Sequence, residues 1–298
     1  MIWVLEDPRA GTAAQALGIA ERLGQPFTRV KLRFGPLAAL PWPWATLAGL
    51  DMTLEAPWPA LVISAGRRSA PVSRWLRARG ARTVHAMRPG LGARDFDLLV
   101  LGAHDRPVAA PHVMIIQGAT HRLTPGALAM ADFPELAALP RPLTGLLLGG
   151  PVRAEGMAPA VARRIATQAA GAGSVVATTS RRTGPAAADA VALALAGTPH
   201  YLHRWGDPGP NPFRAILALA DRLVVTADSI SMLSEALITT TPILMGDPGG
   251  LGPRHRSMAA QLQAAGLAAW QGQPPPPPRA ALDETARVAQ AIRDRGWA

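Results

Sequence analysis

The stretch RLVVTADSISMLSEALITTTPIL, residues Arg222–Leu244, joins a short buried strand to a helix through a polar corner. Its apolar run Leu223–Thr226 predicts the strand, and Ala227-Asp228-Ser229 makes the corner. The first N–H groups of a helix have no partner within it, and the helix dipole favours negative charge there. We therefore expect Asp228 and Ser229 to lie at an anion-binding site.

The helix that follows this corner has two chemically different faces. Ile230, Leu233 and Leu237 recur at the spacing of one apolar stripe. Ser231 and Glu235 are four residues apart and share the face turned away from that stripe. There Glu235 is placed to accept hydrogen bonds from sugar hydroxyls beyond the phosphates of a nucleotide. The alternative is that the serines only cap the helix and that Glu235 faces water, and the spacing alone favours neither interpretation.

The composition is that of a folded protein. The 298 residues are 49% hydrophobic, which supplies one large core or two domain cores. No apolar run approaches the roughly 18 residues of a membrane span, and the first residues do not resemble a signal peptide. The absence of cysteine excludes disulfides, thiolate catalysis and cysteine-ligated metals. We expect a cytoplasmic protein, with peripheral contact to the inner face of the membrane as a further option.

The net charge of +10 comes almost entirely from arginine, because Lys31 is the single lysine. The arginines are spread along the chain, and no basic run is interleaved with the aromatic residues that a base-stacking surface needs. We therefore expect no nucleic-acid partner. The positive field instead favours nucleotides, sugar phosphates or an acidic membrane face.

The N-terminal half alternates strands and helices, which predicts a mostly parallel sheet covered on both faces. The expected strands are residues 2–5, 27–32, 60–64, 82–87, 96–101 and 113–116, and the first helix is expected over 12–23. Ligands of such sheets lie beyond the carboxyl ends of the strands. Six polar residues fall at these ends: Asp7, Arg67, Arg68, His104, Asp105 and His121. Either arginine can fork onto a phosphate or pair with an acid on a neighbouring loop.

The segment 34–50 contains Pro41-Trp42-Pro43-Trp44 in otherwise apolar sequence. Tryptophan is frequent at interfaces, so this segment is a candidate membrane-facing or acceptor-facing loop. We favour the alternative, an irregular helix folded onto the core.

Three prolines and little periodicity in residues 132–142 predict a domain boundary. The pattern divides the chain into domains 1–140 and 141–275 and a segment 276–298. The helix of this last segment is expected to pack back across the interdomain junction.

Two strand ends in the second domain carry residues suited to binding. Gly149-Gly150 follow an expected strand at 144–148 and allow a diphosphate to approach the backbone, although Gly-Gly is also ordinary turn chemistry. The strand expected at 174–177 ends in hydroxyls and arginines, among which Ser180, Arg181 and Arg182 are candidates.

Several segments together resemble one family. They are Asp7-Pro8-Arg9-Ala10-Gly11, Ile63-Ser64-Ala65-Gly66-Arg67-Arg68-Ser69-Ala70, His104-Asp105, Thr178-Thr179-Ser180-Arg181-Arg182-Thr183, Asn211-Pro212-Phe213 and Val225–Ala236. This set is similar to the mitochondrial-fission Elm-type family, whose bacterial members are described as glycosyltransferases. The resemblance covers nearly the whole chain. One departure is Thr12, which stands where the family's first loop often carries an ionisable residue.

The resemblance implies a GT-B fold, in which two Rossmann-like α/β domains with mostly parallel sheets face each other across a cleft. The C-terminal domain would hold the nucleotide-sugar. Gly149 and Gly150 would line its diphosphate with Ser229 and Ser231, and Glu235 would hold the ribose. Gly11 and Asn211 belong to the matching segments, and the two Arg-Arg pairs would contact phosphate or close the cleft.

From these observations we expect a metal-independent glycosyltransferase that uses a nucleoside diphosphate sugar as substrate and needs no cofactor. Its acceptor, expected in the cell envelope, is not identified. The base that takes the acceptor proton is expected to be Asp7 first, then His104 held by Asp105, then His121. The alternatives are a non-catalytic GT-B scaffold that recruits a partner at a membrane surface through a patch around Trp42 and Trp44, and an epimerase or hydrolase of nucleotide-sugars.

Overall fold

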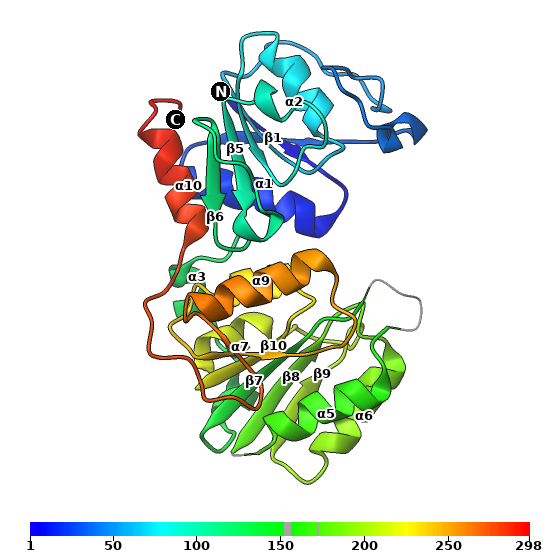
Figure 1. Cartoon of the computed structure of the whole chain (residues 1–298), viewed down its shortest axis with the longest axis vertical. Helices are drawn as coiled ribbons and strands as arrows, with labels where there is room; N and C mark the ends of the chain where they lie inside the picture. Colours follow the sequence, from blue (N-terminus) through cyan, green and yellow to red (C-terminus); the bar gives the residue numbers. More distant parts are fainter. Residues whose placement is uncertain (152–155, 172) are drawn as a thin grey trace. The chain divides into compact units, whose positions relative to one another are not determined.

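The computed structural model describes residues 1–151, 156–171 and 173–298. The chain forms two compact units, of which unit 1 is Met1–Arg122 with Asp283–Ala298 and unit 2 is Leu123–Leu282 (Figure 1). The chain therefore leaves unit 1 before residue 140, and its last helix belongs to unit 1. All strand pairings within the two sheets are parallel, so the expected α/β class with parallel sheets is confirmed.

Unit 1 is built on a sheet of strand order β2-β1-β3-β4-β5-β6. Its strands are β1 (Ile2–Glu6), β2 (Phe27–Lys31), β3 (Leu61–Ala65), β4 (Arg82–Ala86), β5 (Leu98–Gly102) and β6 (Val113–Ile116). Its helices are α1 (Ala10–Leu23), α2 (Ala70–Arg77) and α10 (Glu284–Arg293), with 3₁₀ turns η1 (Pro36–Ala39), η2 (Ala93–Asp95) and η3 (Ala103–Asp105). The central strands β3 and β5 are buried throughout, as apolar strands covered on both faces are.

Helices α1 and α10 lie together on one face of this sheet (Figure 1). Val288, Ala289 and Ile292 of α10 are fully buried in the same core as α1. Two hydrogen bonds also fix α10, from Gln117 N to a Glu284 carboxylate oxygen (2.7 Å) and from His121 N to Thr285 Oγ1 (3.0 Å). Helix α10 is thus an integral layer of unit 1.

Unit 2 contains, in its described residues, a sheet of strand order β12-β11-β10-β7-β8-β9. The strands are β7 (Leu143–Leu148), β8 (Ser174–Thr179), β9 (His200–His203), β10 (Arg222–Thr226), β11 (Ile243–Gly246) and β12 (Ala269–Trp270). The helices are α3 (Pro125–Ala129), α4 (Pro134–Ala137), α5 (Pro159–Ala169), α6 (Pro185–Leu195), α7 (Phe213–Leu219), α8 (Ile230–Ala236) and α9 (Pro253–Ala264). Helices α5 and α6 cover one face, and α3, α4, α7, α8 and α9 pack on the other.

The proline-rich residues 132–142 contain helical structure that the sequence analysis did not predict. Pro125 and Pro134 each occupy the first turn of a short helix, where the missing N–H of proline costs nothing. Leu128, Phe133 and Leu136 of these turns are buried in the core of unit 2. The segment is thus part of unit 2 rather than a linker.

Among the described residues, no helix combines the length and apolar character needed to cross a membrane.

Candidate functional site

The strand order of each sheet reverses at its first strand. β1 lies between β2 and β3, and β7 lies between β8 and β10. Ligands of open parallel sheets bind beyond the carboxyl ends of the strands at such a reversal. In unit 2, β7, β8 and β10 are followed by these candidates from the sequence: Gly149, Gly150, Ser180, Arg181, Arg182, Asp228 and Ser229.

The backbone N–H groups of Gly149 and Gly150 are hydrogen-bonded within the protein. Gly149 N donates to Thr226 Oγ1 (2.7 Å), and Gly150 N donates to Asp228 Oδ2 (2.6 Å). A Cβ on Gly150 would overlap the carbonyl group of Arg182, and its φ is 154°, so both space and backbone conformation require glycine here. The two glycines join the end of β7 to the turns after β8 and β10, and their N–H groups are engaged rather than open to a ligand.

Thr183 closes the turn after β8 against the same glycines. Its Oγ1 lies within hydrogen-bonding distance of Leu148 O (2.9 Å) and Gly149 O (2.5 Å), and it accepts a hydrogen bond from Ser180 N (3.0 Å). Thr183 is fully buried. Because this hydroxyl connects two neighbouring strand ends, it sets the position of the Ser180–Arg182 turn.

Asp228 is buried at the centre of this edge. Its Oδ2 accepts from Gly150 N and lies 3.9 Å from Arg182 Nη1, while Oδ1 is buried without a hydrogen-bond partner in the described part of the chain. Burial lowers the pKa of His255, which lies at the start of α9. The negative charge of Asp228 acts in the opposite direction and is the smaller effect. Asp228 therefore organises the corner and leaves one oxygen with unused acceptor capacity.

Glu235 lies one turn inside α8 and is half-buried. Burial raises the pKa of Glu235 to about 7. In the described part of the chain no cation pairs with its carboxylate and no donor hydrogen-bonds to it. A desolvated acid without a compensating partner is costly for folding, and such groups concentrate at functional sites.

The serines of α8 have different surroundings. Ser229 is buried and caps the helix, since its Oγ accepts from Met232 N (3.4 Å). Ser231 is exposed. The capping alternative considered for these serines thus describes Ser229, whereas Glu235 does not simply face water.

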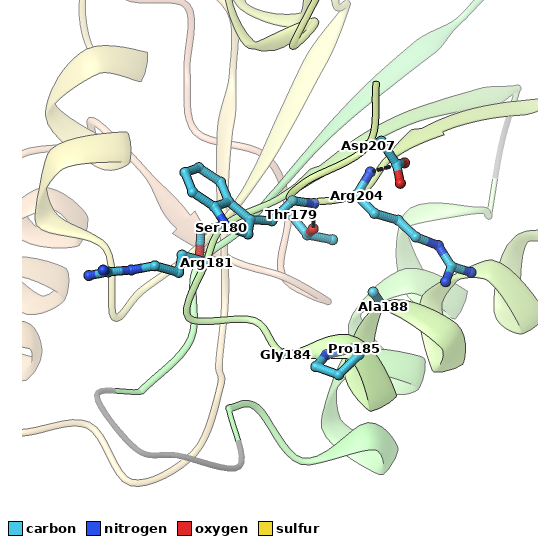
Figure 2. Close-up of a pocket in the computed structure, with 9 residues that line it drawn as sticks. Thr179, Ser180, Arg181, Gly184, Pro185, Ala188, Arg204 and Asp207 are labelled. Atoms are coloured by element: carbon cyan, nitrogen blue, oxygen red, sulfur yellow. Dashed lines mark hydrogen bonds between the residues drawn. The ribbon is translucent and has the colours of Figure 1, made fainter. Parts of the chain in front are cut away.

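Ser180 and Arg181 line a pocket of about 180 Å³ between the ends of β8 and β9 and the start of α6. In Figure 2, Arg181 extends away from Gly184 and Pro185, and Arg204 and Asp207 lie on the other side of the pocket. Asn211 is hydrogen-bonded within the protein. Its Oδ1 accepts from the backbone N of Phe213 (2.9 Å) and from the side chain of Thr178 through Oγ1 (3.2 Å). Of the candidates after β8 and β9, Ser180 and Arg181 line an open pocket, whereas Asn211 is engaged by contacts within the protein.

In unit 1, the buried Asp7 forms an ion pair with the partly buried Arg68 at the ends of β1 and β3. Arg68 Nη2 lies 2.6 Å from Asp7 Oδ1 and Arg68 Nε lies 3.3 Å from Oδ2, while Arg9 N donates to Oδ1 (2.8 Å). Asp7 is 3% exposed. The guanidinium also stands over the ring of Phe34, 4.5 Å from its centroid. Of the two roles considered for these arginines, Arg68 pairs with an acid, and Arg67 is exposed and donates to Ala39 O (2.8 Å).

His104 and Asp105 are both buried in η3, after β5. His104 Nε2 lies 3.9 Å from Asp105 Oδ2, and Arg88 Nε lies 3.5 Å from Asp105 Oδ1. His121 is buried, and its backbone N–H is bound to Thr285 of α10. The three candidates for the general base are Asp7, His104 and His121. All three belong to unit 1, and they follow different strands, β1, β5 and β6.

Gly11 lies in the first turn of α1, because that helix begins at Ala10 rather than at residue 12. A Cβ at Gly11 would meet open space, so this glycine is not required by close packing.

Three residues of the unit 2 edge were not singled out from the sequence. They are Thr183, Thr226 and His255. Thr183 follows β8, Thr226 ends β10 and His255 lies in the first turn of α9. Their positions near strand ends and a helix start could have indicated them, but a threonine that ends a buried strand has no distinctive sequence pattern. In the described part of the chain, no group of three or more His, Cys, Asp or Glu residues is arranged to hold a metal ion.

Comparison with known sequences identifies the family. A family model described as "Mitochondrial fission ELM1" matches residues 10–296. The chain belongs to this family. Among curated relatives, the "Mitochondrial fission protein ELM1" of Arabidopsis thaliana is 28% identical over 223 residues, covering 64% of this chain and 52% of that protein. An uncharacterized protein, RP120, of Rickettsia prowazekii (strain Madrid E) is 32% identical over 114 residues, covering 35% of this chain and 32% of the relative.

The chain thus spans about half of the first relative's length and about a third of the second's. Solved structures with a similar fold include the following two. Acinetobacter baumannii MurG is 14% identical, with a TM-score of 0.53 and coverage of 99% of this chain and 91% of that chain. Arabidopsis thaliana UGT89C1 is 11% identical with a TM-score of 0.52, covering 99% and 93%, and it has also been solved with UDP-L-rhamnose. This family member therefore has a GT-B, glycosyltransferase-like fold.

Proposed function

We propose that the protein is a glycosyltransferase that takes a sugar from a nucleoside diphosphate donor held at the carboxyl edge of the unit 2 sheet. The acceptor class that we propose is a molecule of the cell envelope. The fold of MurG and UGT89C1 supports this reaction class, and the UDP-L-rhamnose complex of UGT89C1 is the precedent for the donor type. The proposal also rests on the chemistry of the chain's own residues.

Glu235 is the observation that carries the proposal. Its carboxylate is desolvated, has no partner within the described chain and follows the β10 corner by one helical turn. A ribose presents two adjacent hydroxyl donors, and an ionised carboxylate accepts both. The donor would thus supply the hydrogen bonds that the protein does not.

Arginines are proposed to stabilise the departing diphosphate. Arg181 is exposed, and the side chain of Arg182 is 32% exposed, so a phosphate can reach either guanidinium. As charge develops on the leaving oxygen, pre-positioned cations lower the barrier without a divalent ion. We accordingly propose a reaction that needs no metal cofactor.

His104 is the proposed general base. The acceptor hydroxyl oxygen would bond to the anomeric carbon of the sugar while the bond to the diphosphate breaks, and the hydroxyl proton would pass to the imidazole. Asp7, the first choice from the sequence, already accepts three hydrogen bonds from Arg68 and Arg9, which leaves about one lone-pair site for a proton. We therefore place Asp7 second.

Isothermal titration with UDP, GDP and dTDP tests the donor site. The wild type is expected to bind one of these nucleotides, and Glu235→Ala to bind it roughly tenfold or more weakly through loss of charge-assisted hydrogen bonds. Glu135→Ala removes an exposed acid from α4 and is the matched control, expected to bind like the wild type. Equal binding by Glu235→Ala would remove Glu235 from the site, and no binding by the wild type would refute the donor proposal.

A second candidate function is a scaffold that recruits a partner at a membrane surface. It is favoured by the apolar surface of residues 37–44, where Leu37, Leu40 and Trp44 are exposed instead of folded onto the core. Arg74 holds this segment in place through its hydrogen bonds to Trp42 O (2.9 Å) and Pro43 O (2.8 Å). Co-sedimentation of wild type and Trp44→Ala with liposomes tests it. Loss of liposome binding in the variant together with no nucleotide binding by the wild type would favour the scaffold.

A further inference from the structure

A groove of about 650 Å³ opens on the outer part of the unit 1 sheet, beside the turn that carries His104 and Asp105. Its floor is apolar and consists of Leu99 and Leu101 of β5 with Val113 of the edge strand β6. One wall is the loop after β4 and the other is the segment 106–112 after η3. The groove is built within unit 1 alone.

Leu99 and Leu101 are buried, and the exposed aliphatic side chains lie beside this floor. Ala70, at the start of α2, and Phe96 pack on Leu99 and Leu101 from one side. On β6, Ile115 stands two residues after Val113, on the same side of the strand, and is 37% exposed. Val108, which lines the groove, is 86% exposed, and Leu91, in the loop after β4, is 51% exposed. An exposed aliphatic side chain in the wall, over an apolar floor, favours an apolar occupant.

The charged residues that line the groove all have the same sign. Arg88, Arg94 and Arg106 line it together with His112, and no acidic side chain does. Arg88 is neutralised by Asp105, but neither Arg94 nor Arg106 forms an ion pair with any described residue. Two arginine side chains thus retain their full capacity to bind an anion.

The backbone holds Arg106 in an uncommon conformation. Its φ of 49° is left-handed, which is unfavourable for a residue with a Cβ, and its N–H donates to Ala103 O (2.8 Å). The η3 turn imposes this conformation. The arginine is therefore placed by a defined turn and not by a loose loop.

We propose that this groove binds a single amphiphilic molecule, a hydrocarbon chain that ends in a phosphate group. The chain would lie on the floor of Leu99, Leu101 and Val113, where it is removed from water. The phosphate would lie between Arg94 and Arg106. This site is separate from the proposed nucleotide site, and the proposal does not depend on nucleotide binding.

Titration of the full-length protein with dodecyl phosphate, kept below its micelle concentration, tests the proposal. We expect binding of one molecule per protein. Dodecanol has the chain without the charge, and inorganic phosphate has the charge without the chain, so each is expected to bind roughly tenfold or more weakly. Dodecanol binding as tightly as dodecyl phosphate would overturn the assignment of the arginines.

Two variants locate the site. Arg94→Ala/Arg106→Ala is expected to weaken dodecyl phosphate binding roughly tenfold or more, and Val108→Glu, which places an acid on an exposed wall residue, is expected to do the same. Arg163→Ala/Arg214→Ala removes two exposed charges from unit 2 and is the matched control, expected to bind like the wild type. Equal weakening in the control pair would mean that net charge and not the groove attracts the ligand.

Vesicles containing an anionic phospholipid distinguish a single bound amphiphile from a membrane surface. Protein that sediments with such vesicles but does not bind monomeric dodecyl phosphate would refute the proposal, because the groove would then dock on a membrane. Binding of the monomer that depends on Arg94 and Arg106 would support it.

Discussion

The acid of Glu235 shows how a single residue can be unfavourable for stability and useful for binding. Its carboxylate is desolvated with no cation nearby in the described chain. The sequence placed Glu235 on the polar face of α8 by its spacing from Ser231, but burial depends on residues from distant segments and cannot be derived from that spacing. A structure was needed to show that this acid is desolvated.

We predict that Glu235→Gln stabilises the protein in a pH-dependent way. The pKa of Glu235 is raised in the folded state, so its contribution to stability is complete below the ordinary glutamate pKa and is lost as the pH rises to about 7. The glutamine variant does not ionise. Above about pH 7 it should be more stable than the wild type by about 1–3 kcal/mol, and near pH 4 the difference should vanish.

Urea unfolding at about pH 5 and about pH 8 measures this difference. The exposed Glu135→Gln is the control and should change little at either pH. A Glu235→Gln effect of the same size at both pH values would show that the acid is not desolvated.

Asp7 and Arg68 illustrate what the sequence could indicate and what it could not. Both were expected at the carboxyl edge of the sheet, and both lie there. The sequence left open whether the arginine meets a phosphate or an acid, because that depends on the side-chain contacts between the ends of β1 and β3. The structure resolves this in favour of Asp7.

We predict that Arg68→Met is strongly destabilising. It leaves the buried Asp7 carboxylate without its cation, which costs about 3–5 kcal/mol. Adding Asp7→Asn should restore part of this loss, because the buried charge is then absent. The comparison pair is Arg29 and Glu6, 2.8 Å apart at the surface, where Arg29→Met should change stability little. Urea unfolding of Arg68→Met, Asp7→Asn, the double variant and Arg29→Met measures these effects. If the effects of Arg68→Met and Asp7→Asn simply add in the double variant, the two side chains do not form a stabilising pair.

At the scale of secondary-structure elements, the sequence predicted most strands to within a few residues. The expected strand 113–116 coincides with β6, and the strand expected at 144–148 matches β7 to within one residue. Long apolar runs bounded by Gly, Pro or polar residues make such strands recognisable. The two-residue strand β12 and the short helices α3 and α4 were missed, since elements this short have no periodicity to detect.

The positions of the candidate residues on the fold were predictable, but their contacts were not. Strand ends indicated which candidate residues lie at the carboxyl edge of each sheet. They did not indicate that Thr226 and Asp228 accept the N–H groups of Gly149 and Gly150, because these contacts join residues almost eighty positions apart. Hydrogen-bond partners across a sheet follow from the strand order, which one sequence does not specify.

Helix α1 provides a prediction about two glycines on one element. A Cβ at Gly18 would overlap His121 O, whereas a Cβ at Gly11 meets open space. Gly18→Ala should therefore destabilise the protein by about 1–3 kcal/mol and displace the His121 backbone. Gly11→Ala should stabilise it by up to about 1 kcal/mol, since alanine favours a helix.

Thermal unfolding of the two variants measures these effects, and each serves as the control for the other. Equal stability of both would contradict the close contact between α1 and the segment at His121.

At the scale of the whole molecule, unit 1 is assembled from two separate pieces of chain. Residues 1–122 and 283–298 form it, and residues 123–282 between them form unit 2. The sequence predicted a helix in the last segment, 276–298. Which unit receives that helix depends on the apolar face that α1 leaves open, and this could not be read from the helix itself.

We predict that deletion of residues 283–298 destabilises unit 1 while unit 2 keeps its structure. The deletion exposes the α1 surface that α10 buries and removes the partners of Gln117 N and His121 N. Hydrogen exchange by mass spectrometry should show loss of protection in α1 and β1, with β7, β8 and β10 unchanged. Gln290→Ala, on the exposed side of α10, should not change this protection. Equal loss of protection in both units would mean that they unfold as one.

The discontinuity of unit 1 has a consequence for biosynthesis. A ribosome completes residues 123–282 before it reaches α10, so the middle of the polypeptide can reach its native state while the earlier part still lacks a layer of its core. The first-made sheet is therefore the last to be finished. Until translation supplies α10, the apolar side of α1 is exposed to chaperones and proteases.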